Sequence, residues 1–116
     1  MKFLKAETFL SKGNDKFILE DYEGALQEYT KTIEIDPNNV FAYESRGTVE
    51  LHLENYSSAL LDFTKAIEME PRALFYCNRG IAKYLLNDRT GALLDWDKAA
   101  ELGELDAYDL IKNYCM

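Results

Sequence analysis

The ten residues ALLDFTKAIE at 59–68 return almost unchanged 33 residues later as ALLDWDKAAE at 92–101. A looser version, ALQEYTKTIE at 25–34, lies 34 residues before the first of these. Self-similarity at a fixed period is typical of repeat proteins, in which each copy is one supersecondary unit that stacks on its neighbours. The chain is therefore predicted to fold as a stack of three similar units.

Further residue types recur in the same register around this phrase. Each unit has a glycine, an aromatic residue four positions before it and an alanine twelve positions after it, and a second aromatic follows the alanine by four positions. In chain order these are Phe9, Gly13, Ala25 and Tyr29, then Tyr43, Gly47, Ala59 and Phe63, then Tyr76, Gly80, Ala92 and Trp96. Apolar residues within each phrase follow the spacing of one helix face, which predicts a helix there.

Capping residues indicate where the helices of each unit begin and end. The residue types just before the three phrases cap helix N-termini by accepting a backbone N–H bond: Asp21, Asn55 and Asp88. The expected helix stops are Pro37, Pro71 and Gly103. Each unit is thus predicted to be a helix, a short turn and a helix.

This pattern resembles the tetratricopeptide repeat over residues 6–102. The resemblance implies an all-α fold, a right-handed superhelical array of antiparallel helix pairs with seven helices. The single domain, residues 1–116, divides into repeat one at 6–39, repeat two at 40–72, repeat three at 73–103 and a capping helix at 104–114. Leu105, Tyr108 and Ile111 at helical spacing favour that last helix, which would cover the final apolar face, over a disordered tail.

The glycines lie inside predicted helices, where glycine costs about 1 kcal/mol relative to alanine. Their shared phase indicates a packing reason. We expect each glycine to let its helix approach the partner helix near the alanine, with the early aromatic filling the space beside that contact.

Basic residues replace the family's usual leucine just before each glycine, and each lies 16 positions ahead of an acid. The pairs are Lys12 with Glu28, Arg46 with Asp62, and Arg79 with Asp95. In an antiparallel helix pair they can face each other, so we predict a repeated ion pair, worth at most about 1 kcal/mol if exposed. Separate solvated charges are the alternative.

The formal net charge is −8, with Lys and Arg scattered singly among acids. This distribution argues against nucleic acid and anionic membrane surfaces as partners, and favours neutral or basic partners over acidic ones. The two cysteines, Cys77 and Cys115, have no motif around them, which predicts no disulfide and a reducing compartment. Without the apolar region of a signal peptide, the expected location is cytoplasmic.

Catalytic and ligand-binding motifs do not emerge from the sequence. His52 is the only histidine, and neither it nor the cysteines have the spacing of metal ligands or of a nucleophile and its base. We expect His52 to be exposed or satisfied, Cys77 to be a small helix residue and Cys115 to be exposed. The chain is therefore predicted not to be an enzyme, and to use no cofactor or metal.

With no catalytic motif, the function is expected to lie in binding through the protein surface. The resemblance implies a concave groove lined by the first helix of each unit. The matching positions are Leu10, Asn14, Phe17, Phe41, Glu44, Thr48, Leu51, His52, Leu74, Cys77, Ile81, Tyr84 and Leu85. Exposed apolar patches mark interaction sites, so we predict a scaffold that docks a peptide or helix of another protein there. Two alternatives stay open: these residues pack against neighbouring repeats or under the capping helix, or the groove is filled by a second copy in a homo-oligomer.

Some members of the family hold the C-terminal carboxylates of a chaperone with Lys, Asn, Asn, Lys and Arg. Here only Asn14 matches, and the other positions hold Leu10, Ser45, Leu74 and Asn78. Without cations nothing neutralises the two carboxylates, so the resemblance does not extend to that function.

Overall fold

The computed structural model describes residues 2–114, with side chains described from Lys5 onward, so the expected exposure of Cys115 lies outside the described residues. Seven helices make up the regular structure of this range, as predicted. They are α1 (Lys2–Ile18), α2 (Tyr22–Ile35), α3 (Val40–His52), α4 (Tyr56–Met69), α5 (Ala73–Leu85), α6 (Arg89–Glu101) and α7 (Asp106–Tyr114). None of the helices in residues 2–114 is both long and apolar enough to cross a membrane.

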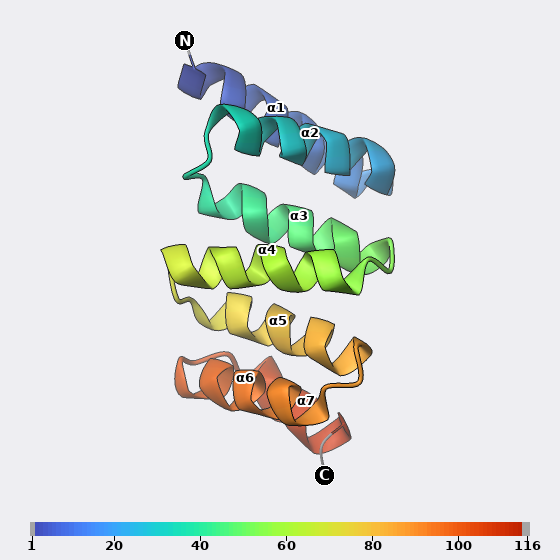
Figure 1. Cartoon of the computed structure of the whole chain (residues 1–116), viewed down its shortest axis with the longest axis vertical. Coiled ribbons are helices and arrows are strands. Elements are labelled where there is room, and N and C mark those ends of the chain that lie inside the picture. Colours follow the sequence, from blue (N-terminus) through green and yellow to red (C-terminus); the bar gives the residue numbers. More distant parts are fainter. Residues whose placement is uncertain (1, 115–116) are drawn as a thin grey trace.

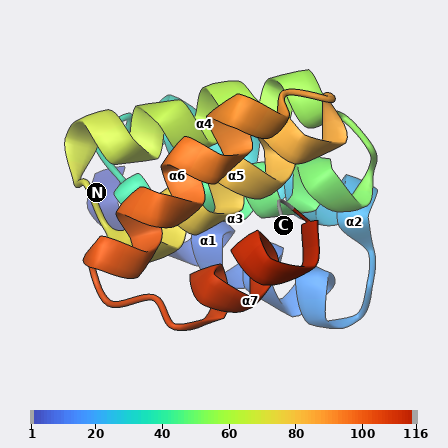
Figure 2. The same cartoon turned by 90° about the horizontal axis from the view of Figure 1, so that it is seen from below.

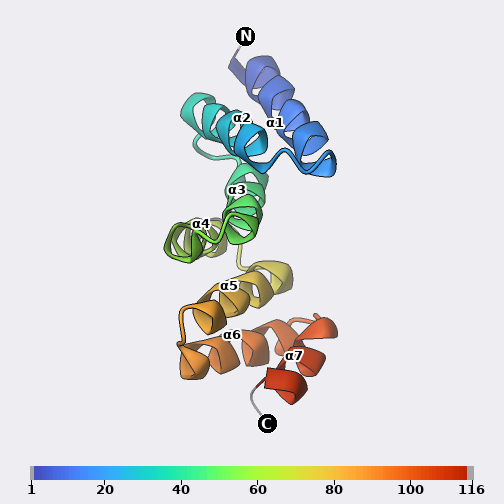
Figure 3. The same ribbon diagram turned by 90° about the vertical axis from the view of Figure 1, so that its right-hand side faces the viewer.

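The helices stack in chain order into an elongated body of 48 × 25 × 21 Å (Figure 1). Viewed from the side, α1, α3, α5 and α7 lie toward one side of the stack and α2 and α4 toward the other, with α1 and α7 reaching further out than α3 (Figure 3). The view from below likewise separates α4 from α7 (Figure 2). This is the predicted all-α array, and its hollow side is formed by the first helix of each unit and α7.

Local chemistry sets the helix boundaries. Asp21 and Asp88 each accept a bond from the backbone N–H three residues on, at 3.0 and 2.9 Å, as predicted. Asn55 occupies the N-cap position of α4 but makes no side-chain cap bond, so that part of the expectation is wrong. Asn39, which the sequence reading did not single out, caps α3 at 3.1 Å. Gly103 follows α6 with φ of 103°, a conformation that glycine adopts without strain.

The side chain nearest to each recurring glycine is an aromatic ring of the second helix, and not the alanine that was expected there. A Cβ atom built on Gly47 would lie 2.7 Å from the Phe63 ring. The nearest atoms to Gly13 and Gly80 belong in the same way to Tyr29 and Trp96. The early aromatics lie elsewhere, because Tyr43 and its counterparts pack under basic side chains. The glycine therefore makes room for the fully buried aromatic side chain of the second helix, since a bulky ring gains most from full burial.

Substituting Gly47 by alanine tests this packing. Alanine favours a helix by about 1 kcal/mol, but the new methyl group overlaps the Phe63 ring, and overpacking costs about 1–3 kcal/mol. We expect a net loss of stability in urea unfolding. Ser11→Ala, at an exposed position in α1, is the control and should leave the free energy of unfolding unchanged or slightly raised. A Gly47→Ala protein as stable as that control would contradict the assignment.

Arg46 of α3 joins three helices. Its Nε and Nη2 atoms donate to the two carboxylate oxygens of Asp62 in α4, both at 2.8 Å, and its Nη1 donates to the Thr30 hydroxyl in α2 at 3.5 Å. This confirms the predicted ion pair in the second unit. The fork also reaches the preceding unit, because a planar guanidinium presents donors in several directions.

The third unit repeats the arrangement. Arg79 of α5 bonds Asp95 of α6 at 2.9 and 2.8 Å and the Thr64 hydroxyl of α4 at 3.4 Å. The energy predicted from the sequence applied to exposed pairs. In the structure the carboxylates are buried, because Asp62 and Asp95 are only 5% and 4% exposed. The Arg46 and Arg79 side chains keep 22% and 18% of their surface exposed, so breaking a pair costs more than the roughly 0–1 kcal/mol of a surface pair and less than the roughly 3–5 kcal/mol of a fully buried one.

The first unit does not follow the prediction. Glu28 is paired with Lys16 at 3.4 Å and Lys31 at 3.7 Å, and not with Lys12. The Lys12 ammonium lies 5.7 Å from the Phe9 ring centre instead. A lysine lacks the rigid fork that lets arginine bind a carboxylate through two parallel hydrogen bonds.

The second unit has its own exception at Glu50, three residues after its glycine. The equivalent Lys83 of the third unit pairs with Asp95 at 3.0 Å, whereas Glu50 places a second carboxyl beside Asp62. Burial, followed by the hydrogen bond and the charge of Asp62, raises the pKa of Glu50 to about 9, against the smaller lowering effect of Arg46. Glu50 is therefore protonated at neutral pH and can donate to Asp62.

Stability should fall with rising pH because of this group. The unfolded chain releases the Glu50 proton near pH 4.5, but the folded chain holds it until about pH 9. The contribution is fully present below pH 4.5 and is lost as pH rises toward 9. Glu50→Gln should match the wild type in acid and be more stable at pH 8, since the amide can still donate to Asp62. Glu23→Gln, on the surface of α2, is the control and should show no such divergence. Parallel pH profiles for wild type and Glu50→Gln would refute the shared proton.

Candidate protein-binding groove

The hollow side of the stack carries three cavities along its length. The first, about 190 Å³, lies among α1, α2 and α3 and is lined by Asn14, Phe17, Tyr29, Glu44, Ser45 and Thr48. The second, about 460 Å³, lies between α5 and α7 and is lined by Leu74, Cys77, Asn78, Ile81, Glu104, Asp106, Asp109, Leu110, Asn113 and Tyr114. The third, about 320 Å³, adjoins it and is lined by Ile81, Tyr84, Leu85, Trp96, Leu110 and Tyr114. These define the groove.

A hydrogen-bonded network borders the first cavity. The Tyr29 hydroxyl donates to Asn14 Oδ1 at 2.6 Å, which fixes the asparagine against α2. Glu44 Oε1 accepts from the Thr48 hydroxyl at 3.2 Å and from Asn78 Nδ2 of α5 at 3.3 Å. Burial raises the pKa of Glu44, and the Thr48 hydrogen bond opposes that rise. The Asn78 bond connects this cavity to the second, so the groove is continuous in its polar contacts from α1 to α5.

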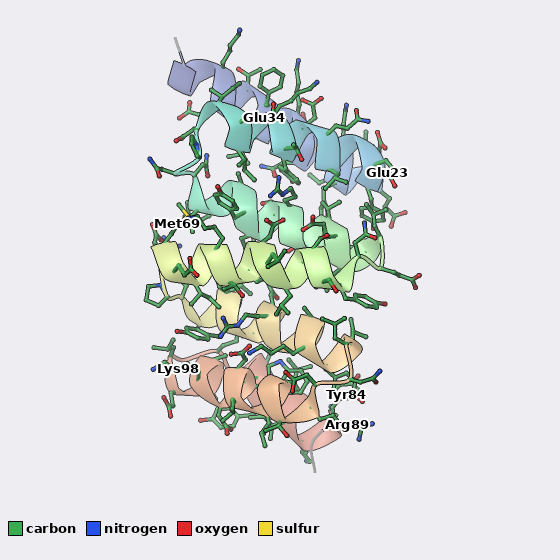
Figure 4. All side chains as sticks on the ribbon, viewed as in Figure 1. Glu23, Glu34, Met69, Tyr84, Arg89 and Lys98 are labelled. Carbon is green, nitrogen blue, oxygen red and sulfur yellow. The ribbon has the colours of Figure 1, made fainter. Side chains whose placement is uncertain are left out.

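The second and third cavities share one wall. Ile81, Leu110 and Tyr114 line both, and they belong to α5 and α7. Tyr84 packs 5.1 Å from Tyr114 and 5.9 Å from Trp96, ring centre to ring centre. Its ring also lies under the Arg89 guanidinium at the lower end of the stack, where both side chains are labelled in Figure 4.

Side chains at the predicted groove positions differ widely in accessibility. Those most open to solvent are Asn14, Phe41, His52, Leu74 and Leu85. The half-buried ones are Leu10, Phe17, Glu44, Thr48, Leu51, Ile81 and Tyr84. Cys77 is a buried free thiol within α5, in agreement with its prediction as a small helix residue. The predicted positions thus divide between the two interpretations: some side chains pack inside the array, and others lie exposed in the groove.

Four predicted positions line none of the three cavities. Leu10 packs with Ala25 and Tyr29, and Leu51 packs against Ala59, Phe63 and Ala82. Phe41 lies under the Arg72 guanidinium at 5.0 Å. His52 stacks on Tyr22, with ring centres 4.6 Å apart and planes 10° from parallel, and meets Phe17 edge-on at 5.5 Å. The exposed histidine therefore has aromatic partners that the sequence reading did not identify.

The sequence analysis expected α7 to be a cap under which groove positions could pack, but it assigned no groove-lining residue to α7. In the structure it supplies one wall of two cavities, with its acids and Asn113 on the second and Leu110 and Tyr114 on both. The spacing of Leu110 and Tyr114, four residues apart, was the available sign that these two side chains share a face.

One pair of substitutions separates packing positions from open ones. Leu51→Lys should lose about 2–4 kcal/mol of unfolding free energy, because it removes apolar contacts with Ala59 and Phe63. Leu85→Lys, at a position 42% exposed, should change it by about 0.5 kcal/mol or less. Thermal or urea unfolding measures both. Equal losses would show that Leu85 is also a packing residue.

Comparisons with known proteins agree with this geometry. The family model for the TPR repeat matches residues 13–51, which include most of the first unit and the first helix of the second. No curated protein sequence matches the chain. Among described residues no group of three or more His, Cys, Asp or Glu side chains is placed to hold a metal ion.

Solved structures extend the likeness over the whole stack. The first TPR of Spaghetti (RPAP3) bound to the HSP90 peptide SRMEEVD is 26% identical, with a TM-score of 0.90, and the match covers 94% of this chain and 89% of that one. The TPR2B domain of yeast Sti1 in a pHsp70 complex is 26% identical, with a TM-score of 0.84 and coverages of 94% and 91%. The second TPR domain of human RPAP3, solved with the HSP70 peptide SGPTIEEVD, shares the fold with a TM-score of 0.94 at 24% identity, over 100% and 99% of the two chains. The repeated residue pattern, the family model over residues 13–51 and the shared architecture agree: this chain has the fold of tetratricopeptide repeat domains and is similar to them along its length.

Proposed function

We propose that this chain is a protein-interaction module that docks a peptide or helix of a partner protein in the groove. The observation that carries the proposal is the presence of three cavities beside α1, α3, α5 and α7, the second and third of which share a wall. Leu74 and Leu85 line this groove while about half exposed, which leaves apolar surface for a ligand to bury. An amphipathic segment laid in such a groove gains affinity by burying its apolar face.

The similar domains support this use of the fold. The first and second TPRs of Spaghetti were solved with the HSP90 peptide SRMEEVD, at 26% and 27% identity to this chain. Peptide docking is thus a property of close structural relatives. Fold alone does not fix function, so the proposal for this chain rests on its own groove.

The partner is proposed to be neutral or basic, unlike the acidic tails of those peptides. No lysine or arginine lines any of the three cavities. A carboxylate entering the groove would lose water without gaining a charged donor, which is costly. The polar groups that can orient a ligand near the first cavity are instead Asn14, Glu44 and Thr48. We also propose a cytoplasmic scaffold role without enzymatic activity, in keeping with the free thiol of Cys77.

Panning a library of random dodecapeptides against the folded protein tests the docking function. Peptides selected on the wild type should lose binding to Leu74→Lys/Leu85→Lys, because two ammonium groups then enter the groove. The matched control is Leu61→Lys/Leu94→Lys, which makes the same chemical change at exposed leucines of α4 and α6 and should retain binding.

The outcomes of the panning distinguish docking of a partner peptide in the groove from the alternatives. Equal loss in both variants, or no selected peptide that depends on the groove, would overturn the proposal. Sedimentation at high micromolar concentration completes the test. A dimer that dissociates only in Leu74→Lys/Leu85→Lys would give the groove to a second copy of the chain.

A further inference from the structure

The second cavity combines an apolar floor with an acidic edge. Leu74, Ile81 and Leu110 supply apolar surface, while three carboxylates, from Glu104, Asp106 and Asp109, stand on the α7 side. We infer, on the basis of the proposed docking function, that this part of the groove is a subsite for a lysine or arginine side chain of the partner, flanked in the partner by large apolar residues.

Charge balance is the first argument. Within residues 2–114, none of the three carboxylates forms an ion pair with a lysine or arginine. The buried carboxylates Asp62 and Asp95, by contrast, each pair with an arginine. Acids in the first turn of α7 also stabilise its N-terminus, but that role does not require them to border an apolar cavity. The cavity is thus the one of the three with an uncompensated concentration of charge on its wall.

The negative charge reaches the cavity floor. Cys77 lies there, and its thiol pKa is raised to about 11, first by burial and then by the charges of Glu104 and Asp106. Because the negative charge of these carboxylates acts on the Cys77 thiol at the floor, it would also attract a cation placed in the cavity. A guanidinium or ammonium placed there would gain charge-assisted hydrogen bonds while its methylene stem covers Leu74 and Ile81.

The adjoining third cavity defines the rest of the ligand. Its lining is apolar and aromatic, with Tyr84, Leu85 and Trp96 beside the shared wall of Ile81, Leu110 and Tyr114. A large apolar side chain next to the cation would fill it. The partner segment is therefore one in which basic and bulky apolar residues are neighbours, a chemistry opposite to that of an acidic tail.

The single tryptophan offers a direct readout. Trp96 lines the third cavity, and its indole donates to the Cys77 carbonyl at 3.1 Å, so filling of either cavity should change its fluorescence. The probe is a synthetic dodecapeptide of three Leu-Arg-Phe-Ser units, which contains no tryptophan. Two control peptides carry Gln or Glu in place of Arg.

The protein variants are matched in charge. Glu104→Gln/Asp106→Asn/Asp109→Asn removes the acidic wall and keeps the oxygen that accepts from the Asp106 backbone N–H. Glu23→Gln/Glu34→Gln/Glu68→Gln removes three exposed acids from α2 and α4, two of which are labelled far from α7 in Figure 4. Both variants have the same net charge, so they separate a local site from general attraction.

The expected result is saturable binding of the Arg peptide to wild type, weakened about tenfold or more at low salt in the α7 variant and by less than about twofold in the control variant. The Gln peptide should bind more weakly and the Glu peptide not at all. Equal weakening in both variants would reduce the effect to net charge and overturn the inference, as would failure of the Arg peptide to change Trp96 fluorescence. If panned peptides depend on the groove but contain no basic residues, the docking function stands and only the cation subsite is lost. If no peptide depends on the groove, the docking function itself fails.

Discussion

A half-buried arginine at each junction between units, bound to a buried carboxylate, organises the stack. Arg46 and Arg79 each hold a carboxylate of their own unit with two hydrogen bonds and a threonine of the unit before with a third. Because the guanidinium is planar, these contacts restrict the relative rotation of three helices at once. Helix packing by apolar side chains alone tolerates more variation in crossing angle. The curvature that brings α1, α3, α5 and α7 to one side thus depends on these polar contacts as well as on the core.

The sequence predicted most of the fold because the fold is periodic. A residue type that recurs every 33 or 34 positions reports on the same environment three times, so the helix pairs, their order and the arginine–carboxylate pairs could be derived from spacing. Where the units differ, the prediction failed. Lys12 occupies the arginine position without its geometry, and Glu28 takes its cations from Lys16 and Lys31 instead. The partner of each glycine was also assigned to the wrong residue, because spacing places alanine and aromatic on one helix face without saying which ring fills a gap.

The groove was harder to derive. The resemblance implied the thirteen positions on the first helices, but it could not distinguish Leu51, which packs on Phe63, from Leu85, which is exposed. That distinction depends on the rotation of each helix relative to its neighbours, a tertiary property. The role of α7 as a wall was missed for a similar reason, because it is not a copy of any unit and no period relates it to the rest. Its acids form part of the proposed binding site only because the apolar residues of α5 line the same cavity.

The arginine–threonine bonds also give the stack a direction and two different ends. Every junction uses an arginine from the later unit and a hydroxyl from the earlier one, at Thr30 and Thr64. At the start of the chain the arginine is replaced by Lys12, and at the end the hydroxyl position holds the exposed Asp97. These two positions differ from the internal ones in opposite ways: Lys12 lacks the fork of an arginine, whereas Asp97 offers a carboxylate, which accepts from a guanidinium more strongly than a hydroxyl does. The two internal junctions are alike in donor and acceptor, so inserting or deleting a whole internal repeat would preserve an arginine–threonine contact at each junction.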